Sequence, residues 1–159
     1  MRNHGEHGEE TTLKDCDERL IDTVLTAVTT VHRRLGPGLF ESVYELATMV
    51  ELEKMTIPAR RQVEIPVLYR GRDLGIGFRA DIIVANCLLL EFKTIDEFSP
   101  VHLAQVITYL KLLRFKRGFL INFSKTLLKD GIKRVSMFLF SPRVPRGRAL
   151  ISMNSKMRT

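Results

Sequence analysis

The chain has 159 residues, of which 45% are hydrophobic and 27% charged, and its formal net charge at pH 7 is +7. This length suits one domain, and no apolar run approaches the roughly 20 residues of a membrane-spanning helix, so we expect no membrane association. The polar start lacks the pattern of a signal peptide and the two cysteines form no CxxC or Cys/His cluster, which indicates a cytoplasmic protein with free thiols.

Two helices are predicted in the first third of the chain, after a disordered start over residues 1–17. From Glu18 to Leu35 apolar residues recur at helical spacing, and the Gly36-Pro37-Gly38 turn ends this helix. A second helix is expected over residues 40–55, before Pro58. Its side chains available for burial are Val43, Leu46, Ala47, Val50 and Leu52.

Three antiparallel strands should follow the helices. Residues 62–70 alternate apolar and polar side chains, and the Gly71-Arg72-Asp73 turn leads into a second strand that reaches Asp81. A three-residue loop, 85–87, then leads to a third strand that contains Glu91.

The hydrophobic pattern of the second and third strands selects their register. With the three-residue loop, Val84 faces Leu88 and Asp81 faces Glu91. We predict an apolar face made of Ala80, Ile82, Val84, Leu88, Leu90 and Phe92, and an opposite face that carries Arg79, Asp81, Glu91 and Lys93. Two carboxylates at cross-strand distance repel each other unless a divalent cation lies between them, and oxygen ligands of this kind favour Mg²⁺ or Mn²⁺.

A third helix should begin at Pro100, because Ser99 can cap it and proline is favoured at its first position. Its predicted buried residues are Leu103, Val106, Ile107, Leu110 and Leu113. His102, Gln105 and Tyr109 are spaced three and four apart and share another face of this helix.

The last third of the chain is basic. Two further strands are predicted over residues 118–123 and 133–140, and residues 141–159 are expected to form a flexible basic tail. From residue 111 onward the only acidic residue is Asp130. This charge would attract a polyanion, or alternatively serve as a solvated surface that aids solubility. The edge strand at 133–140 would pair in a homodimer or be covered by the tail.

Two motifs resemble those of a known nuclease superfamily. Asp81 followed by Glu91-Phe92-Lys93 resembles the D…(E/D)xK signature of the PD-(D/E)xK nucleases, with Ala80 where a proline often stands. The stretch 38–44, Gly-Leu-Phe-Glu-Ser-Val-Tyr, is similar to the motif that names the GxxExxY proteins, a bacterial and archaeal branch of that superfamily. The resemblance implies an α/β (α+β) domain over residues 18–140 with a restriction-endonuclease-like αβββαβ core, in which helices flank a mixed central sheet.

The resemblance also implies a metal-dependent nuclease that hydrolyses phosphodiester bonds of nucleic acid, with DNA favoured over RNA. Asp81, Glu91 and the backbone carbonyl of Phe92 would hold Mg²⁺ or Mn²⁺, and Glu41 would complete the acidic cluster directly or through water. Lys93 would lie beside the attacking water and the scissile phosphate.

Four further residues are predicted to assist. Gln105 resembles the helix-borne glutamine of the superfamily and would orient water or substrate. Tyr44 would fix the carboxylate of Glu41 by a hydrogen bond or contact the nucleic-acid backbone. Arg79 and His102 are predicted to contact substrate, although a histidine in a first helical turn is often a surface residue or a cap partner, and Tyr109 is expected to serve in packing.

Simpler explanations remain open for the same residues. Asp81 and Lys93 could form a cross-strand ion pair, Glu91 could pair with Arg79, and Glu41 could simply lie in an exposed first turn, where its charge favours the helix dipole. For the whole chain, the alternatives are a non-catalytic nucleic-acid-binding module on a degenerate nuclease fold and a structural or interaction subunit.

Overall fold

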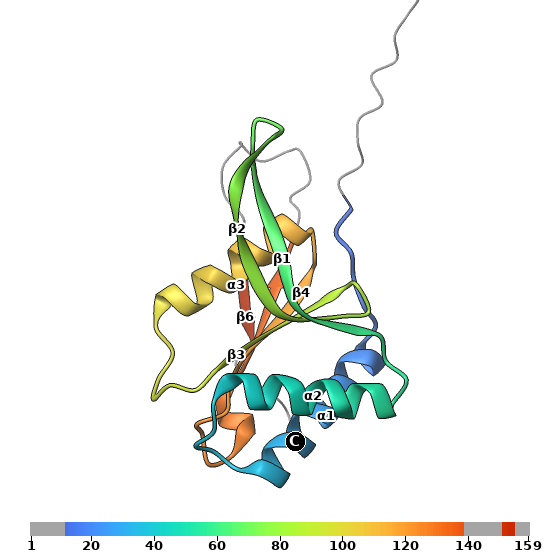
Figure 1. The fold of residues 1–159 in the computed structure, drawn as a ribbon, viewed down its shortest axis with the longest axis vertical. Coiled ribbons are helices and arrows are strands. Elements are labelled where there is room, and N and C mark those ends of the chain that lie inside the picture. Colours follow the sequence, from blue (N-terminus) through green and yellow to red (C-terminus); the bar gives the residue numbers. More distant parts are fainter. Residues whose placement is uncertain (1–11, 139–150, 155–159) are drawn as a thin grey trace, which may run out of the picture.

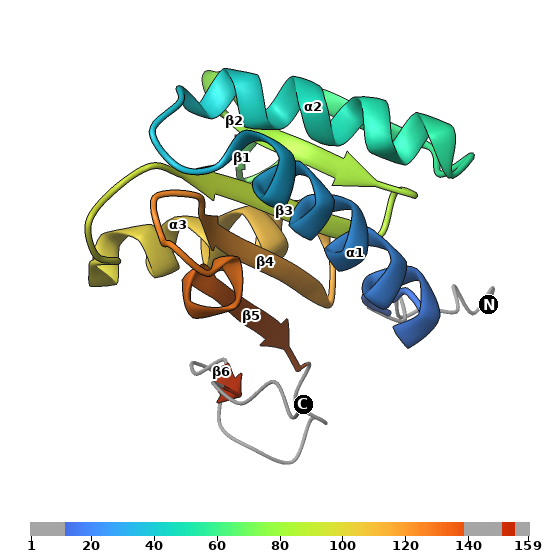
Figure 2. The same ribbon diagram turned by 90° about the horizontal axis from the view of Figure 1, so that it is seen from below.

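The computed structural model of the protein describes residues 12–138 and 151–154. In this part of the chain a mixed sheet of six strands runs in the order β1-β2-β3-β4-β5-β6, with α1 and α2 against one face and α3 against the other (Figure 1, Figure 2). The elements are α1 (Glu18–Leu35), α2 (Glu41–Lys54), β1 (Ala59–Tyr69), β2 (Arg72–Val84), β3 (Leu88–Lys93), α3 (Pro100–Leu113), β4 (Arg117–Asn122), a 3₁₀ turn (Leu128–Gly131), β5 (Ile132–Met137) and β6 (Ile151–Asn154). None of these helices is long and apolar enough to cross a bilayer.

The predicted order of elements is confirmed. Strands β1, β2 and β3 are antiparallel neighbours, α3 then crosses to β4, which is parallel to β3, and β5 is antiparallel to β4. Strand β6 was not predicted, because it lies in the range expected to be a flexible tail. It pairs with β5, where Val135 faces Met153, and so covers part of the edge that the sequence left open. The remaining residues of the expected tail and residues 1–11 lie outside the described part.

The central strands are buried on both faces, which explains their nearly continuous apolar sequence. Ile82 and Phe92 pack in the core beneath α1 and α2, whereas Ile83 and Leu89 pack in a second core against α3. The face that was predicted to be charged carries Asp81, Glu91 and Lys93 at one end of the strand pair, whereas Ile83 and Leu89 make the rest of it apolar. The placement of Ala80 with Ile82 is wrong, because Ala80 belongs to the core against α3.

Helix α2 buries Leu52 as predicted, but the rest of its buried face differs from the prediction. Its buried side chains are Tyr44, Glu45, Thr48 and Leu52, whereas Val43, Leu46 and Val50 are exposed. The Tyr44 ring stacks on Phe123 at 4.2 Å, and its hydroxyl donates to the carbonyl of Gly36 at 2.6 Å. These contacts determine which face of α2 is buried. The sequence did not indicate this face, because apolar residues occur on nearly all sides of the helix.

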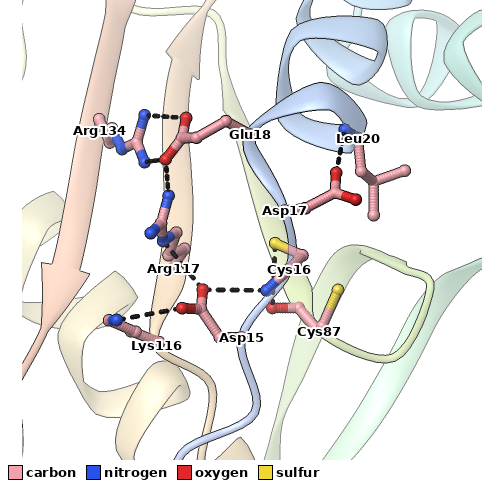
Figure 3. Close-up of polar contacts among 9 residues, drawn as sticks. All are labelled: Asp15, Cys16, Asp17, Glu18, Leu20, Cys87, Lys116, Arg117 and Arg134. Carbon is pink, nitrogen blue, oxygen red and sulfur yellow. Dashed lines mark hydrogen bonds and ion pairs between the residues drawn. The ribbon is translucent and has the colours of Figure 1, made fainter.

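Residues 12–17, part of the range predicted to be disordered, lie against the sheet (Figure 3). Asp15 forms ion pairs with Lys116 and Arg117, both at 3.0 Å, and Glu18 pairs with Arg117 and Arg134. Hydrogen bonds from Arg134 and Arg117 lower the pKa of Glu18 to about 2. Three of the basic side chains expected to attract a polyanion are thus already paired with acidic residues of the same chain.

The cysteines are free thiols, as predicted, and they lie close together. Both are buried, and the Cys16 thiol donates a weak hydrogen bond to the carbonyl of Cys87 at 3.9 Å (Figure 3). Burial raises the pKa of the Cys16 thiol to about 12 and also raises that of Cys87, so neither thiol is an activated nucleophile.

The burial of α2 can be tested with two matched substitutions. Leu52→Ala empties a fully buried site and should lower the free energy of unfolding by about 2–5 kcal/mol. Leu46→Ala, at a side chain that is 53% exposed on the same helix, should change it by less than about 0.5 kcal/mol. Urea denaturation of both variants measures the difference, and equal losses would contradict this orientation of the helix.

Candidate active site

Asp81 and Glu91 lie where strand β2 separates from β3. The two strands pair regularly from Val84 opposite Leu88 to Ile82 opposite Leu90, and this is the predicted register. At the next position, that of Asp81 and Glu91, hydrogen bonds from backbone N–H groups to side-chain carboxylates take the place of backbone–backbone pairing. The backbone N–H of Asp81 donates to Oε1 of Glu91 at 3.0 Å, and the N–H of Phe92 donates to Oδ2 of Asp81 at 2.8 Å. These reciprocal bonds hold the two carboxylates side by side.

Both carboxyl groups are in surroundings that oppose their negative charge. Glu91 is 2% exposed and Asp81 is partly buried. Burial raises the pKa of Glu91, and the charge of Asp81 raises it further. Burial also raises the pKa of Asp81, with smaller contributions in the same direction from Glu45 and Glu41. Burial is the main cause at both residues, and neighbouring carboxylates add to it, so a bound cation would relieve both effects.

Lys93 lies next to this pair without being neutralised by it. Its charge lowers the pKa of both Asp81 and Glu91, yet its ammonium group makes no ion pair with any residue in the described part of the chain. The alternative in which Asp81 pairs with Lys93 and Glu91 with Arg79 is therefore not seen. Arg79 instead lies 3.6 Å from Glu64, and both side chains are largely exposed.

Glu41 approaches the site from the first turn of α2. Its Oε1 accepts a hydrogen bond from the backbone N–H of Thr94 at 3.2 Å, which ties the start of the helix to the end of β3. Residues 12–138 contain no group of three or more His, Cys, Asp or Glu side chains placed to hold one metal ion. Coordination of an ion by Glu41, directly or through water, stays a prediction.

The sequence did not single out Glu45 and Gln62 as site residues, yet they join the site. Glu45 is 3% exposed and accepts hydrogen bonds from Arg61 Nε at 2.7 Å and Gln62 Nε2 at 2.8 Å. The same Gln62 nitrogen lies 3.4 Å from Oδ1 of Asp81. Gln62 has a φ of 53°, in the left-handed region, and interrupts the β1–β2 pairing opposite Asp81. Glu45 follows Glu41 by one helical turn, and that spacing was the available signal.

Helix α3 places Tyr109 near the carboxylates, and Gln105 contacts Tyr109. Gln105 Nε2 donates to the hydroxyl of Tyr109 at 2.9 Å. Tyr109 is buried and packs against Phe78 with ring centroids 5.2 Å apart, so the predicted packing role is seen. Burial raises the pKa of Tyr109, and the charges of Glu91 and Asp81 act in the same direction. The role of Gln105 toward water or substrate stays a prediction.

Two other predicted residues have structural roles in this fold. Nδ1 of His102 accepts a hydrogen bond from the backbone N–H of Ser99 at 2.9 Å, so His102 is a partner in the N-terminal cap of α3, and its contact with substrate stays a prediction. Tyr44 is fully buried and its hydroxyl donates to Gly36 instead of Glu41. The predicted hydrogen bond to Glu41 is therefore wrong, and a fully buried ring offers no surface to nucleic acid. Tyr44 instead fixes the turn that leads into α2.

The donor set fits a hard divalent cation. Asp81 and Glu91 offer only oxygen, and each uses one carboxylate oxygen to accept a backbone N–H. The other oxygens, Oδ1 of Asp81 and Oε2 of Glu91, accept no backbone N–H, and Gln62 reaches the first only weakly. Oxygen ligands of this kind suit Mg²⁺ or Mn²⁺. The carbonyl of Phe92 as a further ligand stays a prediction.

The raised pKa values predict how the stability of the metal-free protein depends on pH. Asp81 and Glu91 bind protons more strongly in the folded chain, so the free energy of unfolding should fall as pH rises from about 4 through their folded-state pKa values. Glu18 acts in the opposite direction, because its lowered pKa contributes stability that is lost only at more acid pH. Asp81→Asn should therefore raise the unfolding temperature at about pH 8 and change it much less at about pH 5.

Thermal unfolding in EDTA at the two pH values measures this effect. Asp22→Asn, at an exposed aspartate in α1, is the matched control and should show no such pH-dependent gain. A gain for Asp81→Asn that is equal at both pH values would show that carboxylate repulsion is not its cause.

A family model described as the PD-(D/E)XK nuclease superfamily matches residues 18–135 of the chain. A search of curated proteins and a search of solved structures each found no match. The family match agrees with the mixed sheet, the αβββαβ order and the helices on both faces, which together form a restriction-endonuclease-like fold. It supports a nuclease-type function in general, whereas assignment to the GxxExxY branch stays a prediction. The chain belongs to the PD-(D/E)XK nuclease superfamily.

Proposed function

We propose that this protein is a Mg²⁺- or Mn²⁺-dependent nuclease that hydrolyses phosphodiester bonds of DNA. One observation carries the proposal: the carboxylates of Asp81 and Glu91 are held side by side by the backbone N–H groups of Phe92 and Asp81, in surroundings that raise the pKa of both. Such an arrangement is costly for a purely structural pair, since buried carboxylates without a cation oppose folding. The choice of DNA rests on the resemblance to restriction-endonuclease-like proteins.

Each residue of the site would have a role in catalysis that follows from its position. Asp81 and Glu91 would hold the ion, which would neutralise phosphate oxygens and favour ionisation of a bound water. Lys93 has no ion-pair partner in the described residues, so its ammonium group is available to orient the attacking water and to offset charge that develops on the phosphate. Gln105, hydrogen-bonded to Tyr109, would position water or substrate from the α3 side.

A second candidate is a non-catalytic module that binds nucleic acid on the same fold. One observation favours it: the part of the chain that the structure describes gathers no three potential metal ligands at one point. A site with two carboxylates can still bind Mg²⁺, because this ion usually keeps several waters and takes only one or two carboxylates from the protein. The two candidates therefore differ in whether the protein cuts.

Cleavage assays test the proposal directly. With labelled single- and double-stranded DNA and RNA, the wild type should cut in Mg²⁺ or Mn²⁺ and not in EDTA. Lys93→Ala should lower kcat by at least about 100-fold, because it removes charge stabilisation at the reacting phosphate. Lys54→Ala, at an exposed lysine of α2, is the matched control and should cut like the wild type. Absence of cutting on every substrate, with salt-sensitive binding intact, would favour the binding module, and absence of both would favour an interaction subunit.

Metal binding can be measured without activity. Mg²⁺ or Mn²⁺ at about 100 times its Kd should stabilise the wild type by about 2.7 kcal/mol. In a thermal-shift titration this stabilisation should be largely lost in Asp81→Asn and retained in Asp22→Asn. Equal shifts in all three proteins would show that the ion does not bind at Asp81.

A further inference from the structure

Strands β1 and β2 extend beyond the rest of the sheet as a two-stranded arm, residues 66–79 (Figure 1). Strand β2 pairs with β3 only over Ile82 to Val84, so the only strand that pairs with the stretch from Arg72 to Arg79 in the described residues is β1. Every residue in that stretch is exposed. A ribbon of this kind buries little apolar surface of its own, and its presence is not explained by the stability of the core.

The arm presents apolar and basic side chains together. Leu68, Tyr69, Leu74 and Ile76 are each at least half exposed. The charged residues of the arm are Arg70, Arg72, Arg79 and a single acidic residue, Asp73, whose Oδ1 accepts the backbone N–H of Gly75. Arginine and exposed aromatic side chains on one element are the combination that contacts phosphates and bases in nucleic-acid complexes.

The base of the arm adjoins the candidate active site. Arg79 precedes Asp81 by two residues, and Phe78 packs against Tyr109, which interacts electrostatically with Glu91. Arg72 lies nine residues from Asp81, a separation of at most about 30 Å, which is the length of a fully extended strand. That distance equals the rise of about nine nucleotides in one strand of a duplex. A polynucleotide with one phosphate at the carboxylates could therefore follow the arm to its tip.

Features of the arm disfavour pairing with a second copy of the chain. The outer strand β1 contains Pro66, which has no N–H to donate, and the β1–β2 register shifts between Pro66 and Leu68. In β2, Gly75 has a φ of 71°, which interrupts the extended backbone. At Gly77 a Cβ would lie 2.4 Å from the carbonyl oxygen of Ile65. Irregular edges of this type oppose strand addition, and the excess of arginine favours an anion as partner.

We propose that the arm is a nucleic-acid-binding element that holds the stretch of polynucleotide next to the scissile phosphate. This inference rests on the proposed function and extends it to the substrate class. The preferred substrates are polynucleotides long enough to reach the arginines at the tip, about nine nucleotides from the cleaved bond, and short oligonucleotides are poor ones.

A double variant, Arg70→Gln with Arg72→Gln, tests the arm. Fluorescence anisotropy with labelled DNA of about 30 nucleotides, single-stranded or duplex, should show binding roughly tenfold weaker at about 0.1 M salt. The slope of log Kd against log salt should fall by about 1.4 for single strands and 1.8 for duplex, since two phosphate contacts are lost. The matched control is Arg33→Gln with Arg34→Gln, an exposed pair on α1 with the same change in net charge.

Length dependence provides the second measurement. With Mg²⁺, the arm variant should raise KM for the long DNA and leave kcat nearly unchanged, and it should cut an oligonucleotide of about four nucleotides as the wild type does, because that length cannot reach the tip. Circular dichroism and unfolding temperature establish that both double variants are folded.

The outcomes separate the arm from the nuclease. If the arm variant and the α1 control weaken binding equally, the arm is not the contact surface. Unchanged DNA binding with a changed molecular mass in light scattering would make the arm a surface for self-association and overturn the proposal. Wild-type protein that binds long DNA through the arm but never cuts would overturn the proposed nuclease function and support the proposed role of the arm. Cutting that the arm variant leaves unchanged would support the nuclease function and overturn the role of the arm.

Discussion

The site is arranged around two hydrogen bonds, from the N–H of Asp81 to the Glu91 carboxylate and from the N–H of Phe92 to the Asp81 carboxylate. Because each carboxylate accepts the N–H of the opposite strand, β2 and β3 separate at this point without leaving those backbone groups unpaired. The separation leaves β2 free of β3 and lets it continue with β1 into the arm. The same separation brings two negative charges together in a buried place, which leaves the site in need of a cation.

The surrounding elements hold this pair from three directions. Helix α2 brings Glu41 to the end of β3 and Glu45 to Gln62, and its orientation depends on the contacts of Tyr44 with Phe123 and the turn at Gly36. Helix α3 covers the other face with Tyr109. An ion pair of Asp15 with Arg117 ties the N-terminal segment to β4, and one of Glu18 with Arg134 ties the start of α1 to β5 (Figure 3). A single polar centre is thus supported by packing on both faces of the sheet.

Prediction succeeded where a short-range pattern decides the structure. Helix α1 begins and ends at the predicted residues, Glu18 and Leu35, because periodic apolar residues are followed by a Gly-Pro-Gly turn. The three-residue loop and the alternation beside it predicted the register of β2 and β3 from Val84–Leu88 to Ile82–Leu90, one residue before Asp81 and Glu91. Prediction failed for the buried face of α2, because apolar residues surround this helix. It also failed for the role of Tyr44, because its ring partner Phe123 is distant in sequence. Strand β6 was missed because its partner, β5, and not its own pattern, makes it a strand.

The sequence by itself therefore determined the order of elements, the pairing of β2 with β3 and the presence of two carboxylates and a lysine at one end of that pair. These features depend on local periodicity and on loops of a few residues, which a chain specifies directly. Only the tertiary structure decided which face of α2 is buried, that Glu45 and Gln62 join the site, that Lys93 lacks an ion-pair partner among the described residues and that β1 and β2 project as an arm. Those features depend on contacts between segments far apart in the chain, where packing and charge in three dimensions outweigh local preference.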